Sequence, residues 1–575
     1  MSYEQNCQTW LHSECLTPAE RERVSELAKN PELSELYFSA PMTFGTAGLR
    51  SVMDMGPGCM NVYTVAHITQ AIANLILQEG KMSRGVAVAY DSRLNSRLFA
   101  ETAASVFAAN SIVVYLFDDI RPTPELSFAI RHLGCIAGVN ITASHNPKAY
   151  NGYKAYWEDG AQISPSQASV ISNMAAEIDM LCGAKRMDYD VAVNEGRITL
   201  LGSDFDEFYL SAVLKTTINQ DAIAKVADSL KIVYTPLHGA GRRLVPEIMR
   251  RIGIKHIYTV DSQMTPDGHF PTVKKPNPEY ADVFTDGIAI ANQVGSDLVI
   301  ATDPDADRVG VMCRVANGQF ITLTGNQMGA LLLHYVISAA KEQGTLTEND
   351  YAVKSFVSTD LANRICATHG VKLYEVPTGF KYIGEVIKTY EAEGKTGKFL
   401  LGFEESYGYL FGTYARDKDA VGATMMICEM TAWYAAKGMT LGDAIEHIYA
   451  TYGLYREGMI DIYMEGLSGI ENRKKVMAGL RQNPPKDIGR IKVAYAADYA
   501  SGIEICMADG SERAAALSGL DVLSYTMENG DKVVVRPSGT EPKIKIYLLC
   551  HDTNPTHLEQ KIAAYTKTAN GFCIL

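Results

Sequence analysis

Several features that mark other classes of protein are missing from this chain of 575 residues. No uninterrupted apolar run approaches the roughly 18 residues that a membrane-spanning helix needs, so we expect no membrane partner. The first residues, Met1-Ser-Tyr-Glu-Gln-Asn-Cys, lack the basic start and the apolar run of a signal peptide. We therefore expect a cytoplasmic protein.

Paired cysteine motifs are also missing. The eleven cysteines are scattered from Cys7 to Cys573, and no two of them are spaced C-x-x-C. This scatter argues against a disulfide framework and against a structural zinc site. We expect reduced thiols in the core of a cytoplasmic protein.

An excess of positive charge is absent as well. Lys plus Arg number 53 and Asp plus Glu number 66, which gives a net charge of −13. An acidic chain lacks the diffuse positive field that holds a phosphate backbone, so we expect no nucleic-acid partner. A local basic pocket still suffices for a small anionic substrate. Apolar residues make up 47% and charged residues 21%, which excludes bulk disorder.

A strand–helix–strand alternation is present three times, over residues 86–117, 231–260 and 352–376. This alternation predicts parallel sheets and three related α/β domains. The last hundred residues differ, because Asn529-Gly530 between two apolar runs is a strong hairpin signal and predicts a smaller α+β domain. The first 40 residues read as a helical extension, with Thr17 as a helix cap. The predicted domains are 1–200, 201–320, 321–455 and 456–575.

Four short apolar runs end abruptly in dense polar loops. In open α/β sheets ligands bind at the carboxyl ends of strands, so one such loop per domain predicts four domains around one central cleft. The loops are Thr142-Ala-Ser-His-Asn-Pro, Asp303-Pro-Asp-Ala-Asp-Arg, Gly402-Phe-Glu-Glu-Ser-Tyr-Gly and Arg536-Pro-Ser-Gly-Thr-Glu-Pro.

The aspartate loop points to a metal. Asp303, Asp305 and Asp307 alternate over five residues, and clustered carboxylates repel one another unless a cation neutralises them. All-oxygen ligands favour Mg²⁺ or Mn²⁺. A calcium EF-hand fails, because Arg308 and Arg314 stand where that motif needs Gly and Glu. A phosphatase-type aspartate nucleophile and a solvated acidic turn are the alternatives.

The serine loop points to phosphoryl chemistry. Ser144 follows a buried run but is not in a G-x-S-x-G elbow, so a hydrolase nucleophile is not indicated. His145 and Lys154 supply basic groups suited to a phosphoserine, which carries nearly two negative charges. A plain turn serine before Asn-Pro is the alternative.

The remaining two loops suit a sugar phosphate. The loop from Arg536 combines a guanidinium fork, hydroxyls and a glycine that lets backbone amides approach a phosphate; a charged hairpin connection is the alternative. Glu404 and Ser406 supply acceptors for sugar hydroxyls, although a surface acidic turn is the better interpretation of this loop taken alone.

Together these four motifs, in this order and spacing, resemble the signatures of the α-D-phosphohexomutases. The resemblance covers about residue 40 to the C-terminus. The segment Phe44-Gly-Thr-Ala-Gly-Leu-Arg50 is similar to the start of the bacterial-type phosphoglucomutases in that family and of their phosphopentomutase-type relatives.

The resemblance implies a protein of three α/β domains and a smaller C-terminal domain. It implies that Ser144 is the phosphorylated nucleophile, and that Asp303, Asp305 and Asp307 hold one Mg²⁺ that also touches the Ser144 phosphate. Three further residues match family positions near the transferring phosphoryl group, namely Arg50, His145 and Lys154, while Arg308 adjoins the metal loop and is expected to bind substrate.

The resemblance also implies a substrate-binding set. Sugar-facing or ligand-contacting positions are matched by Thr378, Gly379, Lys381, Glu404, Ser406 and Lys418, and the phosphate that is not transferred would be gripped by Arg536, Ser538, Gly539 and Thr540. Two positions depart from the family pattern. Pro304 stands where Gly is common, and the sugar loop reads Gly-Phe-Glu-Glu, which leaves open whether Glu404 or Glu405 faces the sugar; the Glu-x-Ser spacing favours Glu404.

The implied activity is reversible conversion of glucose 1-phosphate and glucose 6-phosphate through a phosphoserine and glucose 1,6-bisphosphate. Lys154 or Arg50 would assist proton transfer. Small phosphosugars would be the partners of a monomer or weak homo-oligomer. The alternatives are a phosphopentomutase, a phosphomannomutase, an inactive sugar-phosphate-binding homologue and a metal-dependent phosphatase.

Overall fold

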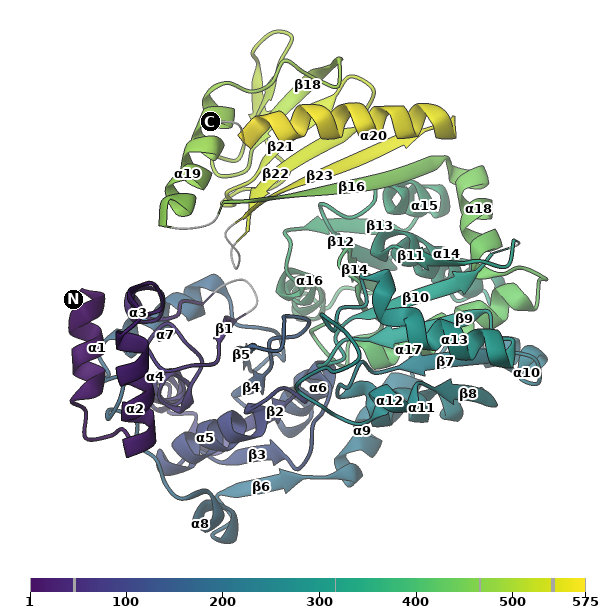
Figure 1. Cartoon of the computed structure of the whole chain (residues 1–575). Coiled ribbons are helices and arrows are strands. Elements are labelled where there is room, and N and C mark those ends of the chain that lie inside the picture. The colour runs from purple at the N-terminus through teal and green to yellow at the C-terminus, as the bar shows by residue number, and fades with distance from the viewer. Residues whose placement is uncertain (1, 45–47, 316, 465–466, 539–542, 574–575) are drawn as a thin grey trace. The chain divides into compact units, whose positions relative to one another are not determined.

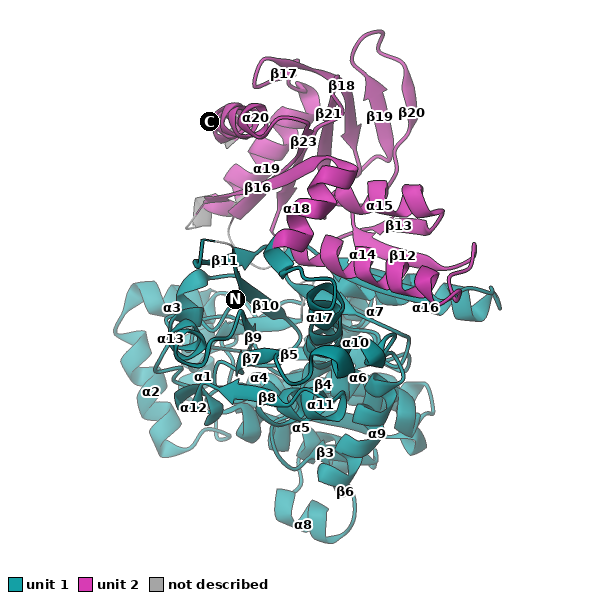
Figure 2. Cartoon of the chain, turned by 90° about the vertical axis from the view of Figure 1, so that its right-hand side faces the viewer, with its two compact units in different colours: residues 1–325, 379–442 teal, residues 326–378, 443–575 magenta. Residues whose placement is uncertain are grey.

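The computed structural model describes residues 2–44, 48–315, 317–464, 467–538 and 543–573. The chain divides into two compact units, coloured separately in Figure 2. Unit 1 comprises residues 1–325 and 379–442, and unit 2 comprises residues 326–378 and 443–575. Each unit is described by itself.

Three helices open unit 1: α1 (Tyr3–Leu11), α2 (Pro18–Ala28) and α3 (Pro31–Phe38) (Figure 1, purple). The predicted cap is confirmed, because the Thr17 side chain accepts from the backbone of Glu20 while the Glu20 side chain bonds back to the Thr17 amide. Trp10 lies edge-on to the rings of Phe38 and Tyr63, so these helices share a small apolar core with the domain that follows.

One expectation about cysteine is wrong. Cys15, between α1 and α2, is disulfide-bonded to Cys182, which follows α7 (Pro165–Ala176). The bond joins the helical extension to the first domain across 167 positions of sequence. Spacing motifs could not reveal it, because only the tertiary fold brings the two thiols together. The other cysteines that the structure describes with their side chains are free and almost all buried, as expected.

The first α/β domain is built on a mixed sheet in the order β1-β5-β4-β2-β3-β6. Its parallel part, β4-β2-β3-β6, confirms the predicted alternation. Strand β5 is antiparallel to β4, and β1 is antiparallel to β5. The strands are β1 (Leu49–Val52), β2 (Val86–Tyr90), β3 (Val114–Phe117), β4 (Ala137–Ile141), β5 (Tyr150–Trp157) and β6 (Ile198–Leu201).

Helices α4 (Val62–Gln78), α5 (Ser96–Ala109), α6 (Thr123–Leu133) and α8 (Tyr189–Asn194) belong to the same domain. Asp91-Ser92 reads as a helix cap in the sequence, but α5 begins at Ser96. The Asp91 carboxylate is used elsewhere: it accepts from the Arg93 amide and from the hydroxyls of Ser96 and Thr142.

The second α/β domain follows the same plan with sheet order β11-β10-β9-β7-β8. Strands β8, β7 and β9 are parallel, whereas β10 and β11 are antiparallel to their neighbours. Its elements include β7 (Lys231–Thr235), α11 (Gly241–Arg251), β8 (His256–Thr259), α13 (Thr285–Val294), β9 (Leu298–Thr302), β10 (Val309–Arg314) and β11 (Phe320–Leu323), preceded by α9 (Ser203–Leu214) and α10 (Gln220–Val226).

The third α/β segment contributes to both units. In unit 2, β12 (Tyr351–Ser355) and β13 (Lys372–Val376) are parallel and flank α15 (Leu361–His369), as the sequence predicts; α14 (Gly325–Glu342) begins at the unit boundary and α18 (Leu441–Tyr452) ends the segment. In unit 1, β14 (Phe399–Glu404) and β15 (Gly408–Leu410) form an antiparallel pair between α16 (Phe380–Ala392) and α17 (Ala420–Ala435).

The C-terminal part of unit 2 is an antiparallel sheet in the order β16-β23-β22-β21-β18-β19-β20, with β17 beside β18 (Figure 1, yellow-green). The predicted Asn529-Gly530 hairpin is confirmed between β21 and β22. The elements are β16 (Leu454–Tyr463), α19 (Leu467–Gln482), β17 (Asp487–Ile488), β18 (Ile491–Asp498), β19 (Ile503–Cys506), β20 (Glu512–Ala514), β21 (Leu523–Met527), β22 (Lys532–Pro537), β23 (Lys543–Asp552) and α20 (Pro555–Asn570).

The four polar loops share a local topology that the sequence does not reveal. Each connects two antiparallel neighbours: β4 to β5, β9 to β10, β14 to β15, and β22 to β23.

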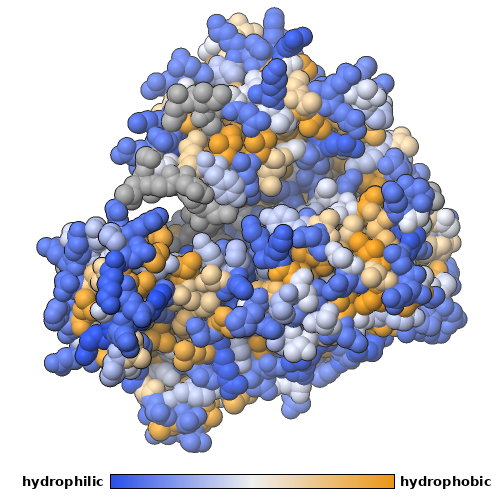
Figure 3. Space-filling model, in the orientation of Figure 1, coloured by the Kyte–Doolittle hydropathy of each residue, from blue (hydrophilic) through white to orange (hydrophobic). Residues whose placement is uncertain are grey.

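Hydrophilic residues cover much of the face drawn in Figure 3, with hydrophobic residues interspersed among them. Among the described residues, none of the helices has the length and hydropathy required to cross a membrane.

Candidate active site

Ser144 is almost fully buried in the loop between β4 and β5, in a left-handed backbone conformation with φ of 51°. A non-glycine residue adopts this conformation only where its surroundings enforce it. The Ser144 amide donates to Thr142 Oγ1 at 2.8 Å. Its hydroxyl donates to Asp303 Oδ2 at 2.7 Å and lies 3.2 Å from His145 Nδ1. The fold therefore brings the predicted nucleophile to the first aspartate of the predicted metal loop.

The metal loop is the hairpin turn between β9 and β10. Asp303 Oδ1 closes the turn by accepting from the amides of Asp307 and Arg308, and Ala306 takes φ of 49° at its tip. All three aspartate side chains are buried, at 0–2% exposure. The turn therefore buries all three carboxylates close to one another.

Pro304, the departure from the family pattern, forms part of the support of this loop. Its carbonyl accepts from the Ala240 amide, just before α11. Gly239 lies so close that a Cβ there would be 2.5 Å from Pro304 Cα. The start of α11 is therefore packed directly against the backbone of the metal loop.

Two lysines balance the carboxylates. Lys154 Nζ donates to Asp305 Oδ2 at 2.7 Å and to Asp307 Oδ2 at 2.9 Å, and Lys418 Nζ lies 3.2 Å from Asp307 Oδ2. Burial opposes ionisation of Asp307, but Lys154 and Lys418 outweigh it and hold the pKa of that carboxyl well below its usual range. Burial and the other two aspartates raise the pKa of Asp303 well above its usual range.

The three aspartates fit a divalent metal ion. One carboxylate oxygen from each lies within 4.8 Å of the others. Asp305 Oδ1 and Asp307 Oδ1 are buried and accept no hydrogen bond from any residue that the structure describes. Buried acceptors without partners are costly, and a cation between them would satisfy both. The donors are oxygens alone, which is the set that hard divalent cations prefer.

Further basic groups surround Ser144. Arg50, at the start of β1, donates to Asn146 Oδ1 at 3.2 Å, and within the described part of the chain its buried Nε has no hydrogen-bond partner. Arg308 forms an ion pair with Glu279 at 2.7 Å. Burial and the two guanidinium groups lower the pKa of His145 well below its usual range.

The sugar loop lies in the same unit as Ser144. Glu404, at the end of β14, is buried, and its Oε1 accepts from the Gly379 amide at 2.7 Å. Burial and the neighbouring Glu405 raise the pKa of Glu404. Ser406 is partly exposed in the same turn. The turn is tied to the metal loop, because the Val309 amide donates to the Tyr407 carbonyl.

Lys418 and Lys381 flank this loop. Lys418 Nζ lies 5.6 Å from the centre of the Phe380 ring. Burial opposes its charge, but Asp307 and Asp417 raise the pKa of Lys418. Lys381 is partly buried, and burial lowers its pKa.

The sequence interpretation missed Asp417. This fully buried carboxylate accepts from the Tyr156 hydroxyl and Gln162 Nε2, both at 2.9 Å, and also from Lys418 Nζ at 2.9 Å. It thereby joins β5 of the first domain to the lysine next to Asp307. The alternation Arg-Asp-Lys-Asp around position 417 was a usable signal, since it places carboxylates on both sides of a lysine.

Thr123 and Asn140 were missed as well. The Thr123 hydroxyl donates to Asp305 Oδ2 at 2.7 Å, and its amide donates to the Asp305 carbonyl. Asn140, the fourth residue of β4, donates to the Thr123 hydroxyl. Neither residue belongs to a polar loop, so no motif indicated them; only the packing of α6 against the metal loop does.

The predicted phosphate loop belongs to unit 2. Arg536, near the end of β22, donates to the Thr378 hydroxyl, and its buried Nε has no hydrogen-bond partner among the described residues. The Ser538 amide bonds to the Lys543 carbonyl, and its own carbonyl accepts from Arg473. Gly539 and Thr540, also predicted for this loop, lie outside the described residues.

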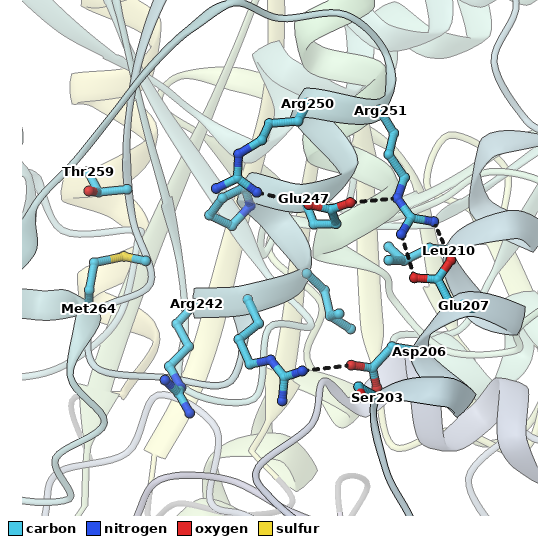
Figure 4. A pocket seen from close by; sticks show the side chains of 13 residues that line it. Ser203, Asp206, Glu207, Leu210, Arg242, Glu247, Arg250, Arg251, Thr259 and Met264 are labelled. Carbon is cyan, nitrogen blue, oxygen red and sulfur yellow. Dashed lines mark hydrogen bonds and ion pairs between the residues drawn. The ribbon is translucent and has the colours of Figure 1, made fainter.

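A separate cavity of about 520 Å³ lies between α9 and α11 in unit 1 (Figure 4). It is lined by several arginines, but most of their charge is paired locally: Arg251 bonds to Glu207 and Glu247, and Arg250 bonds to Glu247. None of the predicted site residues lines it. We therefore place the candidate active site at Ser144 and the aspartate loop.

Comparison with known proteins shows which family the chain belongs to. Sequence models of "Phosphoglucomutase/phosphomannomutase, alpha/beta/alpha domain" I, II and III match residues 41–181, 207–317 and 324–452 in order. The chain belongs to the phosphoglucomutase/phosphomannomutase family. The fold is accordingly three α/β/α domains with a C-terminal domain built on a β-sheet.

Relatives within the family span nearly the whole chain. A phosphoglucomutase of Staphylococcus aureus (strain N315) is 33% identical over 561 residues, which cover 96% of this chain and 99% of the relative. A phosphoglucomutase of Staphylococcus haemolyticus (strain JCSC1435) is 35% identical over 538 residues, covering 92% and 94%. This family member is therefore an enzyme, an isomerase that transfers a phosphoryl group.

Solved structures share the family fold at lower identity. A putative phosphomannomutase from Thermus thermophilus superposes with a TM-score of 0.67 at 22% identity, covering 92% of this chain and 100% of the other. The Paramecium phosphoprotein pp63/parafusin, a phosphoglucomutase, gives a TM-score of 0.67 at 18% identity, covering 93% and 95%.

Proposed function

We propose that this enzyme is a phosphoglucomutase that interconverts glucose 1-phosphate and glucose 6-phosphate through phosphorylated Ser144. The observation that carries the proposal is the buried contact between the Ser144 hydroxyl and Asp303, inside a cluster of carboxylates and lysines. The relatives named phosphoglucomutase, at 33% and 35% identity, support glucose as the sugar.

Asp303, Asp305 and Asp307, with Ser144, would hold Mg²⁺. When bound, this ion supplies positive charge to the oxygens of the phosphoryl group in transfer. The carboxylates hold their positions through the backbone of the turn, through Thr123 and through Lys154. The site is therefore pre-organised by the chain itself.

In the first half-reaction the phosphoryl group leaves Ser144 Oγ and bonds to the free hydroxyl oxygen of the bound sugar monophosphate. The sugar hydroxyl gives up its proton as the new bond forms, and Ser144 Oγ takes up a proton as the old bond breaks, so that the products are a free serine hydroxyl and glucose 1,6-bisphosphate. In the second half-reaction the other phosphoryl group passes to Ser144 Oγ, which leaves the isomeric monophosphate. The Lys154 ammonium and the Arg50 guanidinium stabilise the negative charge of the transferring group.

The other predicted residues bind the parts of the substrate that do not react. Glu404 and Ser406 would accept from sugar hydroxyls, while Lys381, Lys418 and Arg308 add positive charge near the ligand. In unit 2, the Arg536 loop and Thr378 would grip the second phosphate with a bidentate guanidinium fork. This grip is needed because the bisphosphate must be retained while its two ends exchange. Catalytic amounts of glucose 1,6-bisphosphate would therefore activate the enzyme by phosphorylating Ser144.

The proposal is tested with wild type and Ser144→Ala in an assay that couples glucose 6-phosphate formation to its oxidation. We expect wild type to convert glucose 1-phosphate when Mg²⁺ and catalytic glucose 1,6-bisphosphate are present, and Ser144→Ala to lose turnover while still binding substrate. Ser172→Ala, an exposed hydroxyl on α7, is the matched control and should retain full activity.

Other outcomes identify the alternatives. Much faster turnover of ribose 1-phosphate or mannose 1-phosphate than of glucose 1-phosphate would make the enzyme a phosphopentomutase or a phosphomannomutase. Steady release of inorganic phosphate from glucose 1-phosphate would make it a phosphatase. Binding without any turnover would leave only a sugar-phosphate-binding homologue.

A further inference from the structure

We propose that Arg93 is the positioning residue of the phosphoserine loop, holding Ser144 in the conformation from which its hydroxyl reaches Asp303. The inference rests on the proposed function, because it assigns a role in loading and unloading the Ser144 phosphoryl group. Arg93 lies in the segment between β2 and α5, and its side chain has 0% exposure.

One guanidinium group holds most of the loop backbone. Nη2 donates to the carbonyls of Ser144 and Asn146, and Nη1 donates to the carbonyls of Pro147 and Tyr150, both at 3.0 Å. Four carbonyls from one turn thus converge on a single planar cation. A lysine has one nitrogen and cannot span four acceptors spread over seven residues.

The amide side of Ser144 is held through the same network. Asp91 lies 3.3 Å from Arg93 Nε as an ion pair and accepts from the Thr142 hydroxyl at 2.6 Å. Thr142 Oγ1 in turn accepts from the Ser144 amide. Both peptide groups that flank the Ser144 Cα are therefore fixed, one by Arg93 directly and the other through Asp91 and Thr142.

This clamp accounts for the left-handed backbone of Ser144. A serine at φ of 51° is strained relative to ordinary backbone regions, and it stays there only where contacts outweigh the strain. Released from the clamp, the serine would relax and its hydroxyl would move away from Asp303. A displacement of about 1 Å at a reacting atom lowers the rate by roughly 100-fold.

The second domain covers the clamp. Phe270, in the segment that follows β8, places its buried ring 5.2 Å from the Arg93 guanidinium carbon. Gly268 of the same segment is so close that a Cβ would lie 2.4 Å from the Leu94 amide nitrogen. The cation is thus desolvated on this side, which strengthens its bonds to the carbonyls.

The test compares Arg93→Lys with a matched control, Arg84→Lys. Arg84 also donates to two carbonyls, Gly134 and Cys135, but it lies before β2 and far along the chain from the serine loop. For each protein we would measure kcat and KM for glucose 1-phosphate, melting temperature, and the phosphoryl group gained by the intact chain from glucose 1,6-bisphosphate. Ser144→Ala is the blank.

For Arg93→Lys we expect kcat to fall about 100-fold, with KM and melting temperature little changed and slow phosphorylation of Ser144. Arg84→Lys should match wild type. Phe270→Leu, which removes the ring but keeps an apolar cover, should show a smaller fall in kcat of the same kind. Arg93→Ala should regain activity in millimolar guanidinium but not in sodium chloride of equal ionic strength.

The inference is overturned if Arg93→Lys keeps wild-type kcat and phosphorylation rate. It is also overturned if Arg93→Lys and Phe270→Leu lose activity only in proportion to folded protein, because Arg93 would then merely stabilise the domain. A wild-type chain that gains no phosphoryl group at Ser144 contradicts the proposed function instead. The two failures are therefore distinguishable.

Discussion

Several ionisable side chains of this enzyme are buried, where water screens their charge poorly. At the candidate active site, the two lysines beside Asp307 lower the pKa of its carboxyl although burial acts in the opposite direction. The same physics acts in unit 2 at Glu457 on β16. This side chain is half-buried beside Thr359, Asp360 and Lys354. Burial, with Asp360, raises its pKa to about 7, although the Thr359 hydrogen bond and Lys354 act in the opposite direction.

This shift predicts a pH-dependent stability. The folded chain holds the Glu457 proton more tightly than the unfolded chain, whose carboxyl titrates near 4.5. The folded state is therefore penalised increasingly as pH rises from about 4.5 to about 7, and the penalty is complete above that. Glu457→Gln cannot ionise, so we expect it to be more stable than wild type by about 3 kcal/mol at pH 8 and by less than about 1 kcal/mol at pH 5.

Denaturant unfolding at pH 5 and pH 8 measures the difference. Glu528→Gln, an exposed glutamate before the β22 hairpin strand, is the control and should differ from wild type equally at both pH values. A Glu457→Gln difference that does not change with pH would contradict the assignment.

At the residue scale, sequence patterns indicated Ser144, the three aspartates and Lys154 as candidate site residues, and the structure brings these side chains together. The patterns did not identify Arg93, Thr123 or Asp417. These side chains act on other side chains or on carbonyls, and a sequence does not show which carbonyls will converge. Asp91 was visible at the end of a strand but was interpreted as a helix cap.

Secondary-structure elements contribute to the site mainly through their ends. Helix α11 is one example: its start packs against the metal loop, with Gly239 in contact with Pro304. The small residue is required by close approach of two backbones, not by its own dihedral angles.

Gly239→Ala should therefore disturb the metal loop. A Cβ would meet Pro304 Cα at 2.5 Å and Pro304 O at 2.6 Å, and neither backbone atom can rotate away. We expect a loss of about 2 kcal/mol of stability and a higher Mg²⁺ concentration for half-maximal activity. Gly479→Ala in α19, where the added Cβ meets nothing within 4 Å, is the control. Unchanged Mg²⁺ dependence in Gly239→Ala would contradict the expectation.

The N-terminal helices depend on a different kind of link. The Cys15–Cys182 bond restricts the unfolded chain over 167 positions, so its loss is expected to lower stability by up to about 4 kcal/mol. We expect dithiothreitol to lower the melting temperature of wild type. In Cys15→Ser the melting temperature should be low from the start and insensitive to dithiothreitol.

Cys506→Ser, which removes a free and partly exposed thiol, is the control for that experiment and should respond to dithiothreitol as wild type does. Equal melting temperatures for oxidised wild type and Cys15→Ser would show that the bond contributes nothing to stability.

At the scale of the whole molecule, the chain passes between its two units three times, at residues 325, 378 and 442. Unit 2 is consequently assembled from distant segments. Phe356 and Val357, just after β12, pack against Val534 and Tyr547 of the C-terminal sheet. Lys532 of that sheet also pairs with Asp360, the partner of buried Lys354.

A chain ending at residue 452 should therefore not behave as a three-domain enzyme with one domain missing. It would expose Phe356 and Val357 and leave Asp360 without Lys532, so we expect aggregation on size-exclusion chromatography and strong binding of a hydrophobic dye. The full chain, treated in parallel, should be free of both. A truncated chain that is well dispersed and melts cooperatively would contradict this dependence.

The sequence by itself determined the candidates: residue types pointed to a serine, three aspartates and their basic neighbours, and local periodicity pointed to the alternation that builds α/β domains. The tertiary structure alone decided how these groups act on one another. It bonded Ser144 to Asp303, aligned Lys154 with two carboxylates, joined Cys15 to Cys182 and made each polar loop a turn between antiparallel strands. Local patterns encode short-range preferences, whereas contacts between residues 150 or more positions apart are set by the packing of whole domains.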